Sequence, residues 1–587
     1  MIKILKHLKA KEWVLVFIGI VFIVVQVWLD LKLPDYMAEI TILVQTPGSS
    51  LSAVWEAGGY MLLCALGSLS ASIIVGFLAA RIAAAFSQRL RSLLFDKVQG
   101  FSMQEINKFS TPSLITRSTN DITQVQRVIA MGLQVVIKAP ILAVWAIVKI
   151  ADKNWQWTAS TAVAVLVLLA VITTIVFLVM PRFRKIQNLT DGLNRLTREN
   201  LIGIRVVRAY NAEGYQQEKF EETNADLTAT NLFTSRTMAV MFPAMSLIMS
   251  GLSLAIYWLG AALIDAAGMG DKIVLFSNMV VFSAYAMQVV MAFIMMSMMF
   301  IMLPRAAVSG KRIGEVLDTE STILDGTADT DTGSIRGQVE FRHVGFKYPD
   351  AAGYLLKDVS FRANRGDMIA FIGSTGSGKS TLINLIPRFY DATEGEILVD
   401  GINVKDYPLS ALHDKIGYVP QRAVLFSATV RENVAFGDNG KAKPTDEQVE
   451  AAIEAAKAAD FVQAMAGGLD AAIAQGGTNV SGGQKQRLAI ARAICRDPEI
   501  YIFDDSFSAL DYKTDQLLRR ALKAKTADAT NLIVSQRIGT ILNADKILVL
   551  DNGDVVGQGT HKELLANCEV YRQIAYSQLS KEELENV

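Results

Sequence analysis

The feature that most constrains this chain is a series of long apolar stretches before about residue 305. Each stretch is close to the ~20 residues that an α-helix needs to cross a lipid bilayer. The sequence predicts six membrane-spanning helices, at about 13–33, 58–80, 131–150, 156–180, 240–264 and 273–302. With 587 residues the chain also exceeds what a single hydrophobic core supports, so several domains are expected.

The connections between the predicted spans are uneven. Residues 81–130 and 181–239 are polar and helix-periodic, and a hairpin of two helices of this length would reach about 35 Å beyond the membrane. Both excursions carry several Lys and Arg residues, as does the segment before the first span, whereas residues 34–57 have none. The positive-inside rule therefore predicts that both termini and both long excursions lie in the cytoplasm.

Ionisable side chains are few in the predicted spans. They are Asp30, Lys32, Lys138, Lys149 and Asp265, all near span ends, where we expect them to snorkel to the interface. A buried proton relay is therefore not expected, and neither is an obligately charged small polar substrate. The last span carries a methionine stripe at helical spacing, Met287, Met291, Met295, Met298 and Met302. Two interpretations remain open for this stripe: a cavity for varied hydrophobic compounds, or packing against helices and lipid.

The composition changes after the last span. Residues 318–336 are acidic, small and polar, which is typical of a linker. Over residues 337–587, Gly-rich turns separate short apolar runs, as in a soluble α/β domain. The predicted organisation is a transmembrane domain over 1–317, a linker over 318–336 and an α/β domain over 337–587.

A phosphate-binding pattern, G-x-x-x-x-G-K-S, stands near the start of the α/β domain. It comprises Gly373, Ser374, Thr375, Gly376, Ser377, Gly378, Lys379 and Ser380, followed by Thr381. An apolar run at 369–372 precedes it as a predicted strand, and a predicted helix follows, which is the context that this loop requires. The sequence therefore predicts a site for a nucleoside triphosphate, with Lys379 on the β- and γ-phosphates and Ser380 on Mg²⁺.

Later motifs resemble those of one family. Ser481, Gly482, Gly483 and Gln484 resemble the signature sequence of ATP-binding cassette (ABC) transporters, and the strand ending at Asp504 resembles a Walker B motif. Asp511 resembles the D-loop aspartate, Gln421 the Q-loop glutamine and Tyr348 the aromatic residue that stacks on adenine. With the six predicted spans, the whole chain resembles a half-transporter of the ABC exporter type.

The resemblance implies a fold and a set of partners. The expected fold is a six-span α-helical transmembrane domain with long cytoplasmic helical extensions, followed by an α/β P-loop ABC nucleotide-binding domain. The implied cofactors are ATP and Mg²⁺, with Asp504 and Gln421 near the metal. In this family each ATP lies between the phosphate loop of one domain and the signature of the other. Two half-transporters are therefore required, and Ser481–Gln484 would complete the partner's site.

Two positions depart from the pattern of a fast ATPase. The family usually has Glu after the Walker B aspartate, but Asp505 stands here, with a carboxylate about 1.5 Å short, and such misplacement can cost ~10²-fold in rate. The family usually has His where Gln536 stands, and Gln cannot carry a positive charge. Gln475 also replaces the Glu that usually precedes the signature. This combination resembles the degenerate-site subunit of bacterial heterodimeric multidrug ABC exporters, whose own ATP hydrolysis would be slow.

The resemblance extends to function and location. Residues 110–121 and 205–213 resemble exporter segments that couple the nucleotide domains to the spans. The expected activity is ATP-driven export of hydrophobic or amphipathic small molecules across a bacterial inner membrane, in contact with membrane lipid. Alternatives are a dedicated lipid or peptide exporter and an ATP-gated regulatory half that hydrolyses little. No basic excess points to a nucleic-acid partner.

Overall fold

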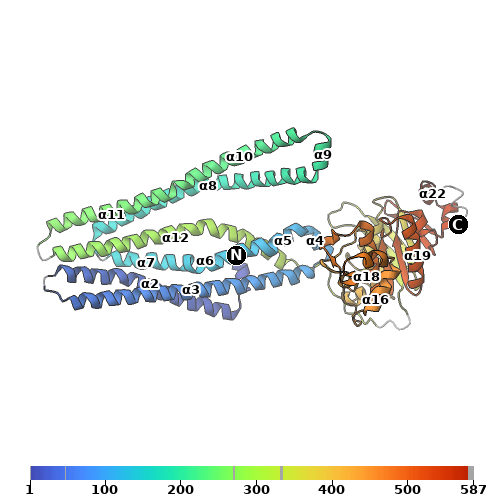
Figure 1. Cartoon of the computed structure of the whole chain (residues 1–587), viewed down its shortest axis with the longest axis horizontal. Helices are drawn as coiled ribbons and strands as arrows, with labels where there is room; N and C mark the ends of the chain where they lie inside the picture. Colours follow the sequence, from blue (N-terminus) through green and yellow to red (C-terminus); the bar gives the residue numbers. More distant parts are fainter. Residues whose placement is uncertain (1, 47, 152, 269–270, 331–334, 580–587) are drawn as a thin grey trace. The chain divides into compact units, whose positions relative to one another are not determined.

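The computed structural model describes residues 2–46, 48–151, 153–268, 271–330 and 335–579. The chain forms two compact units (Figure 1). The first comprises Met1–Gln99 and Thr111–Thr319, and the second comprises Gly100–Ser110 and Glu320–Val587. A short segment of the first long excursion therefore belongs to the same unit as the α/β domain.

The first unit is entirely helical. Its elements are α1 Ile2–Leu5, α2 Ala10–Gln45, α3 Leu51–Gln99, α5 Thr111–Thr116, η1 Arg117–Asp121, α6 Ile122–Gly132, η2 Leu133–Ile137, α7 Lys138–Ala151, α8 Trp155–Ile202, α9 Ile204–Ala209, α10 Glu213–Ala239, α11 Met241–Ala266 and α12 Lys272–Asp318. Among the described residues, six helical segments are long and apolar enough to cross a membrane. The predicted transmembrane fold is confirmed.

The helices α3, α8 and α12 continue well beyond the apolar stretches that predicted the spans. Figure 1 shows α8 and α10 running side by side toward the short α9. The chain forms continuous helices there because breakers are few. Gly203 ends α8, and Pro181 is its one internal proline. The segments η1 and η2 are π-helices, which the sequence did not predict and which are frequent at functional positions.

Ion pairs join α2 to α7 within the helical unit. Asp30 Oδ2 lies 3.2 Å from Lys138 Nζ, and Asp35 Oδ2 lies 2.8 Å from Lys149 Nζ. These side chains are half-buried, because pairing across helices satisfies their charges inside the bundle. The sequence placed Asp30, Lys138 and Lys149 near span ends, and the structure adds that they pair across helices.

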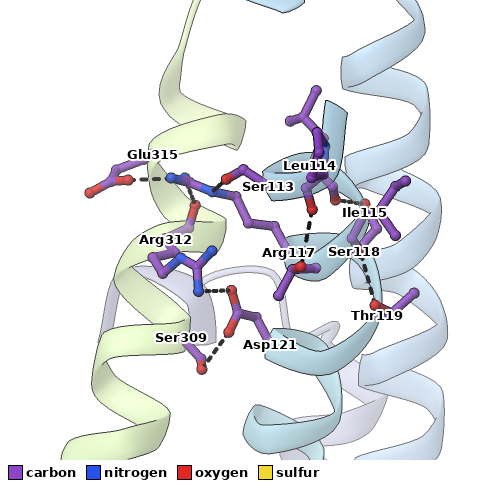
Figure 2. A network of polar contacts seen from close by, with 12 residues as sticks. Ser113, Leu114, Ile115, Arg117, Ser118, Thr119, Asp121, Ser309, Arg312 and Glu315 are labelled. Atoms are coloured by element: carbon purple, nitrogen blue, oxygen red, sulfur yellow. Dashed lines mark hydrogen bonds and ion pairs between the residues drawn. The ribbon is translucent and has the colours of Figure 1, made fainter. Parts of the chain in front are cut away.

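A second polar network joins the first long excursion to α12 (Figure 2). Arg117, at the start of η1, places Nη1 2.9 Å from Glu315 Oε2. Asp121, at the end of η1, accepts a hydrogen bond from Ser309 Oγ at 2.8 Å and pairs with Arg312 Nη1 at 3.2 Å. Asp121 is only 5% exposed, so this carboxylate depends on its partners on α12.

The second unit is an α/β domain with three sheets. Its strands are β1 Val339–Phe346, β2 Leu356–Ala363, β3 Met368–Gly373, β4 Glu394–Val399, β5 Ile402–Asn403, β6 Ile416–Val419, β7 Ala428–Thr429, β8 Ala472–Ile473, β9 Ile500–Asp504, β10 Thr530–Val534, β11 Lys546–Asp551 and β12 Asp554–Gly559. Its helices are α4 Met103–Phe109, α13 Lys379–Asn384, α14 Leu409–Asp414, α15 Val430–Val434, α16 Asp446–Ala455, α17 Ala459–Ala464, η3 Gly468–Asp470, η4 Gln475–Gly477, α18 Gly482–Arg496, α19 Tyr512–Lys525, α20 Ile538–Ile541, α21 His561–Asn567 and α22 Glu569–Tyr576.

The largest sheet positions the nucleotide loop. Its strand order is β12-β11-β3-β10-β9-β6, with β11, β3, β10, β9 and β6 parallel and β12 antiparallel at the edge. Every residue of the central strands β9 and β10 is buried, because both faces of the sheet are covered. An antiparallel sheet of order β2-β1-β4-β5 and the β7-β8 pair complete the domain. The carboxyl ends of β3 and β9 carry the loop and Asp504.

Part of the predicted linker lies against the α/β domain. The N–H groups of Gly326 and Ala328 donate to the carbonyl oxygens of Tyr407 and Asp406, at 3.0 and 2.9 Å. A Cβ atom on Gly326 would lie 2.1 Å from the carbonyl oxygen of Asp406, so only glycine fits this approach. Backbone hydrogen bonds to Asp406 and Tyr407 therefore fix this part of the predicted linker on the α/β domain.

Candidate nucleotide site

The loop between β3 and α13 depends on its glycines. Gly376 and Gly378 have φ values of +86° and +95°, in the left-handed region that side chains disfavour. A Cβ atom on Gly373 would lie 2.0 Å from the carbonyl oxygen of Leu550, on the neighbouring strand β11. The sequence pattern therefore produces a tight loop that lies close to the edge of the sheet.

Lys379 is 7% exposed, and its ammonium group lies within this loop. Nζ donates to the carbonyl oxygens of Gly373 and Ser374, at 2.9 and 2.6 Å, and to Ser377 Oγ at 3.2 Å. Burial lowers the pKa of Lys379, against the raising effect of the nearby Asp505 and Asp504 carboxylates. The loop thus holds one cation among backbone groups, an arrangement suited to a phosphate chain.

Ser380 and Asp504 come together although they are far apart in sequence. Ser380 Oγ donates to Asp504 Oδ1 at 2.7 Å, from the start of α13 to the end of β9. Burial raises the pKa of the Asp504 carboxyl, and the hydrogen bond from Ser380 opposes this. A hydroxyl and a carboxylate side by side are oxygen ligands of the kind that Mg²⁺ prefers, so these residues fit the implied metal, which would neutralise phosphate charge.

Asp505 follows Asp504 in a strained backbone conformation, with a φ of +44°. Its Oδ2 atom lies 3.5 Å from Nε2 of Gln421, and burial raises the pKa of its carboxyl. The side chain of Gln536 is exposed, and its carbonyl oxygen accepts a hydrogen bond from Gln578 Nε2 at 2.7 Å. The fold therefore gathers Asp505 and Gln421, with the Gln536 backbone beside them.

Tyr348 lies next to the loop rather than on a remote strand. Its hydroxyl is 3.0 Å from Thr381 Oγ1, and its ring meets the rings of Phe346 and Tyr390 edge-on, with centroids 4.9 and 5.3 Å away. The tyrosine is half-buried. An exposed part of the ring beside the phosphate loop is compatible with stacking on a base.

The signature residues form the start of α18. Ser481 and Gln484 form a reciprocal capping box, in which Ser481 N donates to Gln484 Oε1 at 2.8 Å. The region is exposed, and no hydrogen bond among the described residues joins it to Lys379 or Ser380. Asp511 caps α19 by accepting from Thr514 N at 2.9 Å. Both motifs thus have a local structural role as well as the one that the resemblance implies.

Sequence reasoning missed two connections to this site. Gln486, on the signature helix, donates from Nε2 to the carbonyl oxygen of Gln421 at 2.7 Å. Asn107, on α4, donates from Nδ2 to the hydroxyl of Tyr390 at 3.0 Å. Neither pair has a local sequence signal, because the partners are distant in the chain and each residue type is common on surfaces.

The first expected coupling segment, residues 110–121, covers α5 and η1, which pack on α12 in the helical unit (Figure 2). The preceding helix α4 belongs to the unit of the nucleotide domain and contacts it through Asn107. The second expected segment, 205–213, covers most of α9 and the start of α10, with Val206 and Tyr210 exposed at 61% and 80%.

The fold and the site together define a membrane protein with six helical spans and a phosphate-loop domain. Residues 16–293 match the ABC transporter transmembrane region, and residues 356–508 match the ABC transporter domain. An uncharacterized ABC transporter ATP-binding protein of Mycobacterium tuberculosis is 40% identical over 89% of this chain and 87% of its own length. The ATP-dependent lipid A-core flippase of Pseudomonas aeruginosa is 33% identical, over 84% of this chain and 80% of its own length.

A solved structure shares the fold. A bacterial Atm1-family ABC exporter with ATP bound superposes with a TM-score of 0.75, covering 96% of this chain and 99% of that one, at 23% identity. The chain belongs to the ABC transporter family and has the architecture of an exporter half-transporter. Its ABC transporter domain binds ATP and implies ATP hydrolysis coupled to transport.

Proposed function

We propose that this chain is one half of a heterodimeric ABC exporter that moves hydrophobic or amphipathic compounds out across the cell membrane. Lys379, Ser380 and Asp504 would hold ATP and Mg²⁺ together with a partner's signature. Asp505 and Gln536 make this site slow. Ser481–Gln484 would complete a second, faster site on the partner. Both termini and both long excursions would lie in the cytoplasm.

The observation that supports the slow site is the environment of Asp505. General bases need to lie within hydrogen-bond reach of the attacking water. The carboxylate of Asp505 is short, its backbone is strained, and Gln421 is at the outer limit of hydrogen-bond distance, 3.5 Å. Gln536, the second departure from the family pattern, has an exposed side chain. Asp505 is therefore a poor general base for the attacking water, and Gln536 is a poor substitute for a cationic His at the γ-phosphate.

The first test is the composition of the assembly. The tagged full chain is purified from its native membrane, and the intact complex is weighed by mass spectrometry. A different half-transporter at one-to-one stoichiometry, with Glu after its own Walker B aspartate, is the expected result. A dimer of this chain alone would contain two Asp505/Gln536 sites and would overturn the asymmetric arrangement.

A lipid exporter is the second candidate function. It is favoured by the relatives that are ATP-dependent lipid A-core flippases. An ATP-gated regulatory half is the third, since a slow site can act as a switch. Substrate flux that continues when the partner's hydrolysis is abolished would support the regulatory function over the pump.

A further inference from the structure

The helical unit contains an apolar cavity between α8, α10, α11 and α12. Its empty space is about 940 Å³, including the part that is open to the outside. The deepest described lining residues, Ile172, Ile175, Val179 and Met245, are 2–9% exposed. Met180 and Phe242 stand at the mouth, at 41% and 69% exposure. The cavity is therefore a pocket with an apolar floor and an accessible opening.

The cavity lies beside Pro181, within the continuous helix α8, and beside the junction of α10 and α11. Pro181 lies inside α8 and removes one backbone hydrogen bond, and Met180 and Phe183 on either side of it line the cavity. On the facing chain segment α10 ends at Ala239 and α11 begins at Met241, and Met238 and Met241 line the cavity. A proline inside a helix is a common cause of a kink. The flexible methionines suit ligands of variable shape.

One charged group meets this apolar surface. Arg305, on α12, is exposed, and its guanidinium lies 5.8 Å from the centre of the Phe183 ring. Within the described parts of the chain, no carboxylate lies in ion-pair distance of Arg305. The polar lining residue Ser297 is already satisfied, since its hydroxyl donates to the carbonyl oxygen of Ile294 at 2.7 Å. Among the described residues, the arginine is therefore a cation at the cavity with no carboxylate partner.

We propose that this cavity binds a membrane phospholipid with an anionic headgroup, one acyl chain on the apolar floor and the phosphate on Arg305. A neutral hydrophobic compound would leave the guanidinium unpaired, whereas a phosphate accepts its fork of donors. The chain turns basic directly after Pro181, with Arg182, Arg184 and Lys185, as expected where a helix leaves the bilayer. The lipid would therefore come from the headgroup level of the leaflet on that side.

The site deepens the proposed function by naming a ligand class, and it depends on that function only for the assignment of the leaflet as cytoplasmic. Its test is a binding measurement that requires neither ATP hydrolysis nor an asymmetric dimer. The purified assembly is titrated in detergent with phosphatidylglycerol and, separately, with phosphatidylcholine of the same acyl chains. Bound lipid is counted by native mass spectrometry.

The wild-type assembly should bind phosphatidylglycerol about 5–10-fold more tightly than phosphatidylcholine, because one arginine near the membrane surface favours an anionic lipid by this order. Arg305→Gln should abolish the preference. Met245→Trp should lower the affinity for both lipids, because the larger side chain would occupy the apolar part of the cavity. Arg182→Gln is the matched control, because Arg182 lies near the same level of α8 but stacks over Phe233, at 4.8 Å, and does not line the cavity. Each variant is first checked for retained ATP binding.

Three results would overturn the site. One is an unchanged lipid preference in Arg305→Gln with normal ATP binding. A second is competition by glycerol phosphate alone, which would mean that the acyl chain is not bound. The third is Met245→Trp leaving lipid affinity unchanged while the two subunits separate, which would mean that the partner subunit fills the cavity.

Discussion

Gln421 places its side-chain nitrogen 3.5 Å from the Oδ2 atom of Asp505, at the limit of a hydrogen bond. Replacing Asp505 by Glu would extend the carboxylate by one methylene toward the loop that holds Lys379. We expect Asp505→Glu to raise hydrolysis at this chain's own site about 10-fold or more, since alignment of a general base is worth up to ~10²–10⁴-fold. Gln536→His in addition should raise it further.

The measurement isolates the chain's own site. ATP turnover is followed in a Ser481→Ala background. This change removes the signature serine that this chain would contribute to the partner's site, so that site is silenced. Asp505→Asn is the control, because it keeps the size but loses the charge, and it should lower turnover. An Asp505→Glu rate no higher than that of the parent would show that Asp505 does not limit hydrolysis.

Ser481 is expected to act on the partner's nucleotide. Ser481→Ala should reduce total ATP turnover by more than 10-fold, while ATP binding to this chain's Lys379 site is unchanged, since a hydrogen bond to a charged group is worth about 1.5–3 kcal/mol. The serine also caps α18, and loss of such a cap costs about 1 kcal/mol of stability. Thr560→Ala separates the two effects, because Thr560 caps α21 in the same kind of capping box. Equal losses of turnover in both variants would show that Ser481 acts only as a helix cap.

A chain of contacts runs from α4 to the phosphate loop through Asn107, Tyr390, Tyr348 and Thr381. Tyr390→Phe keeps the ring beside Tyr348 but removes the hydroxyl that accepts from Asn107. We expect substrate-stimulated ATP turnover to fall about 3–10-fold, corresponding to one lost hydrogen bond of roughly 1 kcal/mol, with basal turnover nearly unchanged. Tyr354→Phe is the control, since its hydroxyl donates to the exposed Glu394. Unchanged stimulation in Tyr390→Phe would exclude this contact from coupling.

The pairing of Asp121 with Arg312 ties the π-helix η1 to α12 (Figure 2). Arg312→Ala would leave the nearly buried carboxylate with Ser309 alone, and we expect a loss of about 1–3 kcal/mol, because Arg312 itself is 35% exposed and partly screened. Thermal unfolding of the helical unit in detergent measures the loss.

Arg198→Ala, at an exposed position on α8, should change stability by less than about 0.5 kcal/mol. The double variant Asp121→Ala/Arg312→Ala should lose less than the sum of the single changes, because the two groups interact directly. Additive losses would show that the pair contributes no coupling energy.

Local patterns in the sequence were sufficient for the architecture. Apolar stretches of bilayer length predicted six spans because a helix in lipid must satisfy its own backbone groups. The phosphate loop was also predictable, because Gly376 and Gly378 need left-handed backbone and Lys379 follows at a fixed spacing. The π-helices η1 and η2 were not, because no local sequence pattern distinguishes a π-helical turn from an α-helical one.

The sequence by itself therefore determined the two kinds of domain and the phosphate loop. The tertiary structure decided which distant residues meet: Lys138 with Asp30, Asn107 with Tyr390, and Arg305 with an apolar cavity. Periodicity and propensity act over a few residues, whereas these contacts join segments brought together only when helices pack. Where Arg305 lies relative to the cavity, for example, depends on how the helices pack, and no local sequence pattern predicts it.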